Sequence, residues 1–393
     1  MPKLIDITGK AISGEWGQEA LEGKGIPVLR TTNFTNEGII KYDDVVTRHI
    51  TKKNIADKML RKGDIIIEKS GGSDKQPVGR VVYFEGEENK FLFNNFTGLL
   101  RVKDTKKWMP RYVFYSLYGN YINGGTKAFE NRTTGLHNLQ TDNYVMSTEV
   151  RDVTLDEQDQ IVKQLDSILE LIAKHRKQLE FLDVLVKSRF IEFFGTYPTN
   201  EKGWNTGNIR DVVSEVSYGS SRPAVDGGRY PYLRMNNITY GGELDLSDTK
   251  RIDIPDNELT KCTVRRGDVL FNRTNSKELV GKTCVYNRDE MMVLAGFVIR
   301  VRVNEKVLPE FLSAFLNTDF SKKMLLGMCK TAIGQANINA QELQNIGLYI
   351  PPIDLQQEFV DFKTQVDKSK LAVQKGLQEL ETLKKSLMQQ YFG

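Results

Sequence analysis

A stretch of forty residues that occurs twice constrains this chain of 393 residues more than any other feature. The first copy covers residues 156–195 and the second covers residues 354–393, and the two superpose at a constant shift of 198 positions without a gap. Both copies lack proline and are rich in Leu, Lys, Gln and Glu, which lose little side-chain entropy in a helix. The repeat therefore predicts two long helices of similar sequence.

The duplication continues outside these helices. Further matches occur in the same order in both halves, and the shift falls steadily from 204 to 198 along the chain. The matched positions are residues 26–33 with 230–237, 61–67 with 265–271, 79–80 with 281–282, Arg101 with Arg300, Pro110 with Pro309, and 135–139 with 334–338. Small loop insertions between two copies of one module would produce this drift, so we infer an internal duplication.

Each module predicts a domain of about 150 residues that is followed by one long helix. Short runs rich in Val, Ile and Phe indicate strands at residues 64–67, 80–84, 99–102 and 268–271. Short helices are expected at residues 108–118 and 308–316, where Pro110 and Pro309 favour a helix start. We therefore predict an α+β fold with mixed α/β domains at 1–152 and 196–350, and long helices at 153–195 and 351–393.

Both long helices carry apolar residues three and four positions apart, as a packing seam requires. These residues are Ile161, Leu165, Ile168, Ile172, Leu179, Leu182 and Val186 in the first helix, and Phe359, Val366, Val373, Leu377, Leu380 and Leu387 in the second. We expect the helices to pair as an antiparallel coiled coil that relates the modules by a pseudo-twofold axis. The alternative is that each helix packs only on its own domain. Lys363, Lys370 and Gly376 interrupt the second seam, and the sequence gives no packing reason for them.

Composition narrows the class of protein. Lys and Arg number 55 against 51 Asp and Glu, so any basic surface must be local. The three cysteines form no C-x-x-C pair, which fits a reducing cytoplasm and predicts neither a disulfide framework nor a zinc site. No signal-peptide core and no run of 18 apolar residues is present, so we expect a soluble cytoplasmic protein that binds no membrane.

No catalytic motif is complete in the sequence. Gly281-Lys282-Thr283 looks like the end of a phosphate-binding loop, but Ser276 stands where that motif needs its first glycine. Asp64 could belong to a nuclease site, yet its duplicate Asp268 at the same Gly-Asp turn favours a structural role. We therefore predict no catalytic residue, no metal site and no cofactor bound by this chain.

Polar and basic residues in equivalent loops of both modules are the candidates for contact with DNA, because such side chains bind phosphates and base edges. The candidates are Arg30, Asn33, Lys69, Ser70, Arg80, Arg132 and Thr133 in the first module, and Arg234, Asn237, Arg273, Thr274, Asn275, Lys282, Thr331 and Gln335 in the second. Residues shared by both modules favour backbone contact or a structural role, whereas positions that differ favour sequence readout.

With these features the whole chain resembles the specificity subunit of a type I restriction-modification system. The resemblance is carried by the duplicated domains, the Lys/Arg-Gly-Asp turns at 62–64 and 266–268, the segments at 135–139 and 334–338, and most specifically by the sequence IPPIDLQQEF at 350–359. The first module has Val153-Thr154 in place of the proline pair. In this family the domains are target-recognition domains and the long helices are spacers.

The resemblance implies a subunit that binds a bipartite, asymmetric double-stranded DNA site, with one half-site per recognition domain. It also implies two methyltransferase subunits that bind the spacer helices and use S-adenosylmethionine, and restriction subunits that use ATP and Mg²⁺. The alternatives are the recognition subunit of a related bipartite system outside type I, a self-sufficient restriction endonuclease, and a protein-interaction scaffold with a coiled-coil arm.

Overall fold

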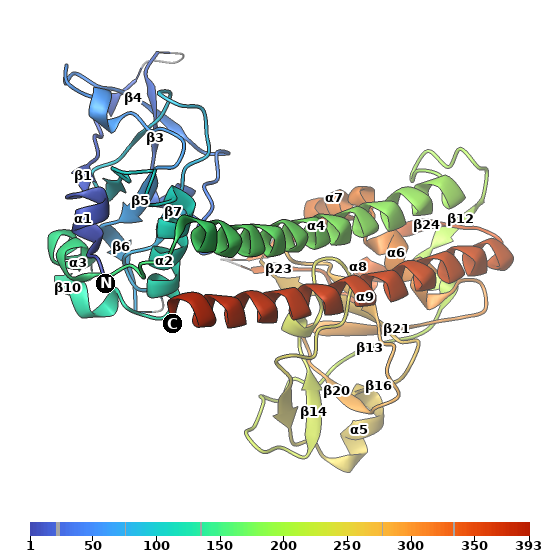
Figure 1. The fold of residues 1–393 in the computed structure, drawn as a ribbon. Helices are drawn as coiled ribbons and strands as arrows, with labels where there is room; N and C mark the ends of the chain where they lie inside the picture. Colours follow the sequence, from blue (N-terminus) through green and yellow to red (C-terminus); the bar gives the residue numbers. More distant parts are fainter. Residues whose placement is uncertain (21–23, 75, 134–135, 277, 333–334) are drawn as a thin grey trace. The chain divides into compact units, whose positions relative to one another are not determined.

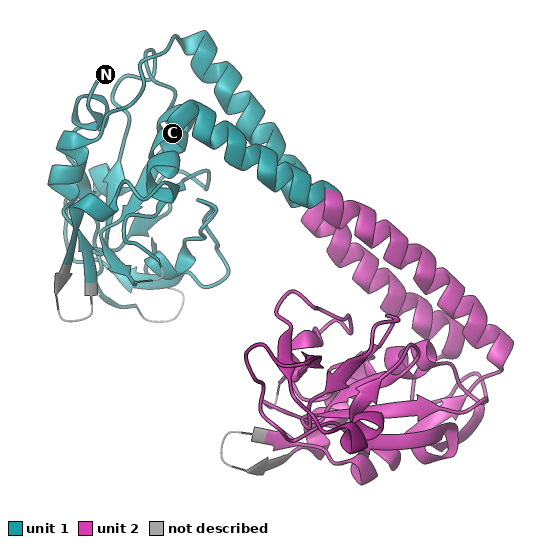
Figure 2. Ribbon diagram, turned by 90° about the horizontal axis from the view of Figure 1, so that it is seen from below, with its two compact units in different colours: residues 1–174, 376–393 teal, residues 175–375 magenta. Residues whose placement is uncertain are grey.

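The computed structural model describes residues 1–20, 24–74, 76–133, 136–276, 278–332 and 335–393. The chain divides into two compact units, residues 1–174 with 376–393 and residues 175–375 (Figure 2). Each unit combines one of the predicted domains with a part of both long helices (Figure 1). The long helices are therefore shared between the units and do not form a body of their own.

The first unit contains three small sheets. The first has the order β1-β9-β5-β7, formed by Ile12–Ser13, Thr97–Leu100, Ile65–Glu68 and Val81–Tyr83. The second has the order β2-β4-β3-β8, formed by Gln18–Glu19, Val46–His49, Ile26–Leu29 and Leu92–Phe93. The third has the order β10-β11-β6, formed by Glu130–Thr133, Leu136–Leu139 and Ser70–Gly72. The described helices are α1 (Leu4–Thr8), α2 (Pro110–Ile122), α3 (Thr141–Ser147), the first part of α4 (Leu155–Phe194) and the last part of α9 (Ile353–Phe392).

The second unit repeats the first and third of these sheets, and it repeats the second sheet with the fourth strand at the opposite edge. Its sheet β13-β21-β17-β19 is formed by Val213–Tyr218, Val298–Val303, Val269–Asn272 and Thr283–Val285. Its sheet β15-β14-β20-β16 is formed by Lys250–Ile252, Tyr230–Leu233, Met292–Leu294 and Thr263–Val264, and its sheet β18-β23-β22 by Thr274–Asn275, Gln335–Asn337 and Lys330–Ala332. A further pair joins β12 (Asn205–Asn208) to β24 (Gly347–Ile350). The described helices are the last part of α4, α5 (Asp256–Cys262), α6 (Pro309–Leu316), α7 (Asp319–Met328), α8 (Ala340–Gln344) and the first part of α9 (Ile353–Phe392).

The matching strand orders confirm the internal duplication, and the strand register corrects one of the matched positions. Residue 65 pairs with residue 100 in the first unit, and residue 269 pairs with residue 301 in the second. Arg101 is therefore equivalent to Arg302, and its match with Arg300 was wrong. A shift of 201 also fits the steady fall from 204 to 198 better than the value of 199 that Arg300 requires.

The Gly-Asp turns have the structural role that the duplication predicted. Asp64 and Asp268 are both buried, and each accepts hydrogen bonds from the equivalent arginine. Arg101 Nη2 lies 2.7 Å from Asp64 Oδ2, and Arg302 Nε lies 2.9 Å from Asp268 Oδ1. A buried carboxylate with a charged partner is a structural pair rather than a free catalytic group.

The long helices pack against each other in opposite directions within each unit. In the first unit the beginning of α4 meets the end of α9, where Leu165 and Met388 share one buried cluster. In the second unit the end of α4 meets the beginning of α9, where the ring centroids of Phe194 and Phe359 lie 5.5 Å apart. The predicted antiparallel pairing is confirmed, and the alternative of a helix packed only on its own domain is wrong.

Each domain also holds the end of the helix that belongs to the other module. Phe392, at the end of α9, packs on Tyr112 of α2 with ring centroids 5.5 Å apart. Phe194, at the end of α4, packs on Phe311 of α6 at 5.0 Å. These two contacts occupy equivalent positions in the two modules, so each domain core is completed by a segment from the opposite half of the sequence.

A buried glutamine fixes the beginning of each long helix to its own domain. Gln158 Oε1 accepts a hydrogen bond from Met109 N at 2.8 Å, and its Nε2 donates to the carbonyls of residues 107 and 153 at 3.0 and 3.1 Å. Gln356 makes the equivalent bonds, with Leu308 N at 2.8 Å and with the carbonyls of residues 306 and 351 at 3.1 and 2.8 Å. Both amides are fully used, which leaves these positions little tolerance for other side chains.

We expect Gln158→Ala and Gln356→Ala each to destabilise the chain, by about 1–3 kcal/mol for each buried backbone group left unpaired. The exposed Gln160, on the same helix as Gln158, provides the matched control as Gln160→Ala. Urea unfolding followed by circular dichroism measures the difference. Equal midpoints for Gln158→Ala and Gln160→Ala would contradict the anchoring role.

Candidate DNA-recognition sites

Nine of the fifteen predicted DNA contacts lie on or beside one small sheet in each unit. In the first unit this sheet joins β6 to the hairpin β10–β11, and in the second it joins β18 to the hairpin β22–β23. One backbone pair is equivalent in both, because Ser70 pairs with Asn138 and Thr274 pairs with Asn337. The register then differs, because a β-bulge in the first sheet pairs His137 with Gly72, whereas Ala336 of the second sheet pairs with Asn275. We call these two sheets the recognition sheets. They bring together residues from segments more than sixty positions apart in the sequence.

A basic residue precedes the edge strand β6 or β18 of each recognition sheet. Lys69 Nζ donates to Ser13 Oγ at 3.1 Å, and burial lowers the pKa of this lysine from its ordinary value. The equivalent Arg273 lies over the ring of Tyr218, with its guanidinium carbon 4.9 Å from the ring centroid. Both cations are therefore oriented by the domain, as a residue that positions a phosphate must be.

The neighbouring positions differ between the two recognition sheets. Ser70 is followed by two glycines, whereas Thr274 is followed by Asn275. The Thr274 side chain is nearly buried, and its hydroxyl donates to Asn337 Oδ1 at 3.1 Å. Asn275 Oδ1 accepts from the backbone of Ser276 at 2.8 Å. In this conformation the Thr274 hydroxyl orients the side chain of Asn337. Asn337 is exposed, and it was not among the DNA contacts predicted from the sequence.

Four further candidates belong to these sheets by their backbone alone. Arg132 and Thr133 lie in β10, Thr331 lies in β22 and Gln335 lies in β23. Their side chains lie outside the described part of the structure, so their contact with DNA stays a prediction. One buried polar pair in the hairpin β10–β11 was not predicted from the sequence. In this pair His137 Nδ1 lies 2.5 Å from Glu130 Oε1.

The other six candidates form the frame of each domain. Asn33 and Asn237 are each only 2% exposed. In both, Oδ1 accepts from the backbone N–H three residues earlier, at 2.9 and 2.8 Å, and Nδ2 donates to two carbonyls of the following turn, at 2.8 to 3.2 Å. These buried hydrogen bonds give both asparagines a structural role in the turn, and their contact with DNA stays a prediction.

Arg30 and Arg234 contact the turn that the buried asparagine also contacts. Each donates through Nη2 to an aspartate fourteen residues later, Asp44 or Asp248, at 2.9 Å. About a quarter of each arginine side chain is exposed, at 25% and 23%. The shared contact shows a structural role, and a phosphate contact by the exposed part stays a prediction.

Arg80 and Lys282 occupy equivalent positions, and their side chains donate to equivalent backbone carbonyl groups. Arg80 pairs with the buried Glu68 at 2.9 Å and donates to the carbonyl of residue 31 at 3.3 Å. Lys282 donates to the equivalent carbonyl of residue 235 at 2.8 Å, and burial lowers its pKa. Where the first module has Glu68 the second has Asn272. Both cations therefore have a structural role within their domain, and their contact with DNA stays a prediction.

Other kinds of site find little support in the described residues. Among them no three His, Cys, Asp or Glu side chains are grouped so that they could hold a metal ion. The three cysteines are free thiols. Of the helices described, none is long and apolar enough to cross a membrane.

Residues 4–182 and 201–383 each match the family described as type I restriction modification DNA specificity domain. The chain belongs to this family. The two matches coincide with the two modules, and they confirm the predicted DNA-specificity subunit of a type I system without catalytic activity of its own. The family match favours a specificity subunit over a self-sufficient endonuclease and over a protein-interaction scaffold.

Individual relatives agree with this assignment. The type I restriction enzyme EcoKI specificity subunit of Escherichia coli (strain K12) is 22% identical over 373 residues, which are 90% of this chain and 78% of that protein. The putative type I restriction enzyme MjaX specificity subunit of Methanocaldococcus jannaschii is 24% identical over 193 residues, 48% of this chain and 45% of that protein.

Solved structures of the same architecture support the fold. The type I restriction-modification S subunit from M. genitalium has a TM-score of 0.56 at 13% identity, and covers 100% of this chain and 95% of its own. A chain from work on complex assembly and conformational transition of the type I R-M system has a TM-score of 0.58 at 16% identity, with 100% and 96% covered. At this identity the likeness concerns the fold alone, and it agrees with the predicted fold class.

The buried pair at positions 68 and 80 gives a test of the structural assignment. We expect Glu68→Asn to lower the stability by about 3 kcal/mol, because it leaves Arg80 buried without its carboxylate. The double variant with Arg80→Lys reproduces the combination of the second module and should recover at least half of this loss in a urea titration.

DNA binding by a variant without the charge at position 80 distinguishes a frame residue from a phosphate contact. The slope of log affinity against log salt should be the same for the double variant Glu68→Gln with Arg80→Met and the unmodified chain, each measured with its methyltransferase partner. A slope smaller by about one would show that Arg80 neutralises a phosphate.

Proposed function

We propose that the two domains read two different half-sites of one bipartite, asymmetric double-stranded DNA site. One observation carries this proposal: the recognition sheets have the same strand order but differ in their side chains, Lys69-Ser70-Gly71 in one and Arg273-Thr274-Asn275 in the other. Sheets of the same topology would approach DNA in a similar manner, while different donors and acceptors would select different bases.

The basic residues of both sheets provide affinity without sequence information. Lys69 and Arg273 occupy equivalent, oriented positions at the start of the segment. Contact of such cations with phosphates makes binding depend on salt. In this proposal Arg132, Thr133, Thr331 and Gln335 read base edges or phosphates from the adjoining hairpins.

The spacer helices are the proposed platform for partners. Both helices expose large apolar side chains, including Phe181, Val184 and Leu371, which are 60%, 57% and 68% exposed. Apolar residues on a helix surface are typical of protein interfaces. We propose that two methyltransferase subunits bind here and supply the S-adenosylmethionine site, and that restriction subunits supply the ATP- and Mg²⁺-dependent steps, all in the cytoplasm.

Lengthening both spacer helices tests the division between readers and spacer. An insertion of about seven residues, or two helical turns, at facing positions of α4 and α9 adds about 10 Å to each helix. This length corresponds to about three base pairs of B-DNA. Methylation mapping in cells should then show an altered gap between two unchanged half-sites.

The matched control is a scrambled sequence of the original length at the same exposed helix positions, which should leave gap and half-sites as they were. A map in which the insertion changes the bases of a half-site and preserves the gap would contradict the proposal.

A further inference from the structure

The two domains hold an equivalent turn by different means. In the first domain the turn at residues 35–40 lies against α2, where Phe114 and Tyr118 stack with ring centroids 5.9 Å apart. Gly38 lies so close that a Cβ atom would sit 2.6 Å from Phe114 Cζ, and Tyr118 Oη donates to the carbonyl of residue 36 at 3.2 Å. Aromatic packing therefore fixes this turn.

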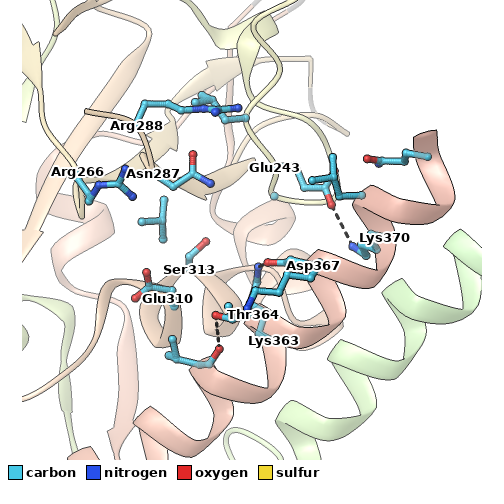
Figure 3. Close-up of a pocket in the computed structure, with 17 residues that line it drawn as sticks. Glu243, Arg266, Asn287, Arg288, Glu310, Ser313, Lys363, Thr364, Asp367 and Lys370 are labelled. Carbon is cyan, nitrogen blue, oxygen red and sulfur yellow. Dashed lines mark hydrogen bonds and ion pairs between the residues drawn. The ribbon is translucent and has the colours of Figure 1, made fainter. Parts of the chain in front are cut away.

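In the second domain small side chains replace these rings. Helix α6 has Ser313, Ala314 and Asn317 at the positions of Phe114, Tyr115 and Tyr118. A cavity of about 560 Å³ lies here, lined by α6, by α9 and by the turn that contains Gly242 and Glu243 (Figure 3). A second cavity of about 330 Å³ is lined by Asn317 and shares Glu243 with the first. The turn at residues 239–244 therefore lacks the aromatic support of its counterpart.

One lysine connects this turn to both long helices. Lys370 of α9 is 12% exposed, and its Nζ lies 3.0 Å from Glu243 Oε1 of the turn (Figure 3). The same Nζ bonds Asp183 of α4. Burial alone lowers the pKa of Lys370, but the bonds to Asp183 and Glu243 outweigh burial and raise the pKa above its ordinary value. Lys370 therefore joins three separate segments of the second unit as a cation.

The first unit cannot build the same contact. The residue equivalent to Lys370 is the buried Ile172, and the residue equivalent to Glu243 is Ile39. The ion pair thus appears where the aromatic packing is missing, and the aromatic packing appears where the ion pair is missing.

We propose that Lys370 is a positioning residue that fixes the turn at residues 239–244 of the second domain to both spacer helices. The turn transmits this restraint through hydrogen bonds. Thr239 and Glu243 are hydrogen-bonded to each other, and Asn237 Nδ2 donates to the carbonyl of Asp245 at 2.8 Å. Asn237 ends the short helix that follows β14, so the restraint reaches the sheet β15-β14-β20-β16. The consequence for DNA reading rests on the proposed function, whereas the restraint itself does not.

Hydrogen exchange of the full chain tests the restraint without DNA. In Lys370→Met the amides of residues 239–250 should exchange about fivefold faster, since local opening no longer breaks an ion pair. Residues 35–46 of the first domain should be unchanged. Lys370→Arg keeps the charge and should retain slow exchange, and Lys368→Met, an exposed lining residue of the same cavity, should have no effect. Glu243→Gln should give a smaller increase at the same amides, and it serves as the test if Lys370→Met does not fold.

Methylation mapping of the same variants separates this inference from the proposed function. Lys370→Met should relax one half-site and leave the other unchanged, whereas Lys370→Arg should resemble the unmodified chain. Unaltered exchange at residues 239–250 in both Lys370→Met and Glu243→Gln would overturn the positioning role. A single contiguous site for the unmodified chain would instead overturn the proposed function and leave the exchange result standing.

Discussion

The structure depends on the burial of each long helix end in the domain of the opposite module. Phe392 lies against Tyr112 in the first unit, and Phe194 lies against Phe311 in the second. Aromatic side chains bury large areas, so these contacts are strong restraints on where each helix can end. Neither domain core is complete without residues from the other half of the chain. A duplicated chain with independent modules would not need this exchange.

The hydrogen bonds that hold each domain together recur in both modules, whereas the side chains of the recognition sheets differ. The asparagine-capped turn, the Gly-Asp turn with its arginine and the buried glutamine of each helix recur with nearly the same hydrogen bonds. The recognition sheets keep their strand order but differ in their side chains and in the β-bulge of the first sheet. This separation of constant frame from variable surface is what a protein with two different readers of DNA requires.

Much of the architecture could be predicted from the repeat. The gap-free shift over forty residues indicated two equal helices, and α4 and α9 run within the predicted ranges, from Leu155 to Phe194 and from Ile353 to Phe392. Their antiparallel pairing followed from the similarity of the seams. The order of strands within each sheet could not be predicted, because it depends on contacts between segments far apart in the chain.

The individual sites were harder to predict. A polar residue that recurs in both modules, such as Asn33, serves either the frame or DNA, and only its buried hydrogen bonds decide between the two. The role of Gln158 could have been predicted from the sequence, because glutamine recurs at the equivalent position 356 on an otherwise apolar helix face. Lys370 could not be explained from the helix alone, because its partner Glu243 lies 127 positions away.

In the proposed function, one chain reads two unlike half-sites through two equivalent domains. The decisive measurement is the mapping of methylated bases in cells that contain the unmodified chain and its methyltransferase partner. We expect two short half-sites of different sequence, separated by a fixed gap in which any base is tolerated. One uninterrupted site, or two identical half-sites, would contradict it.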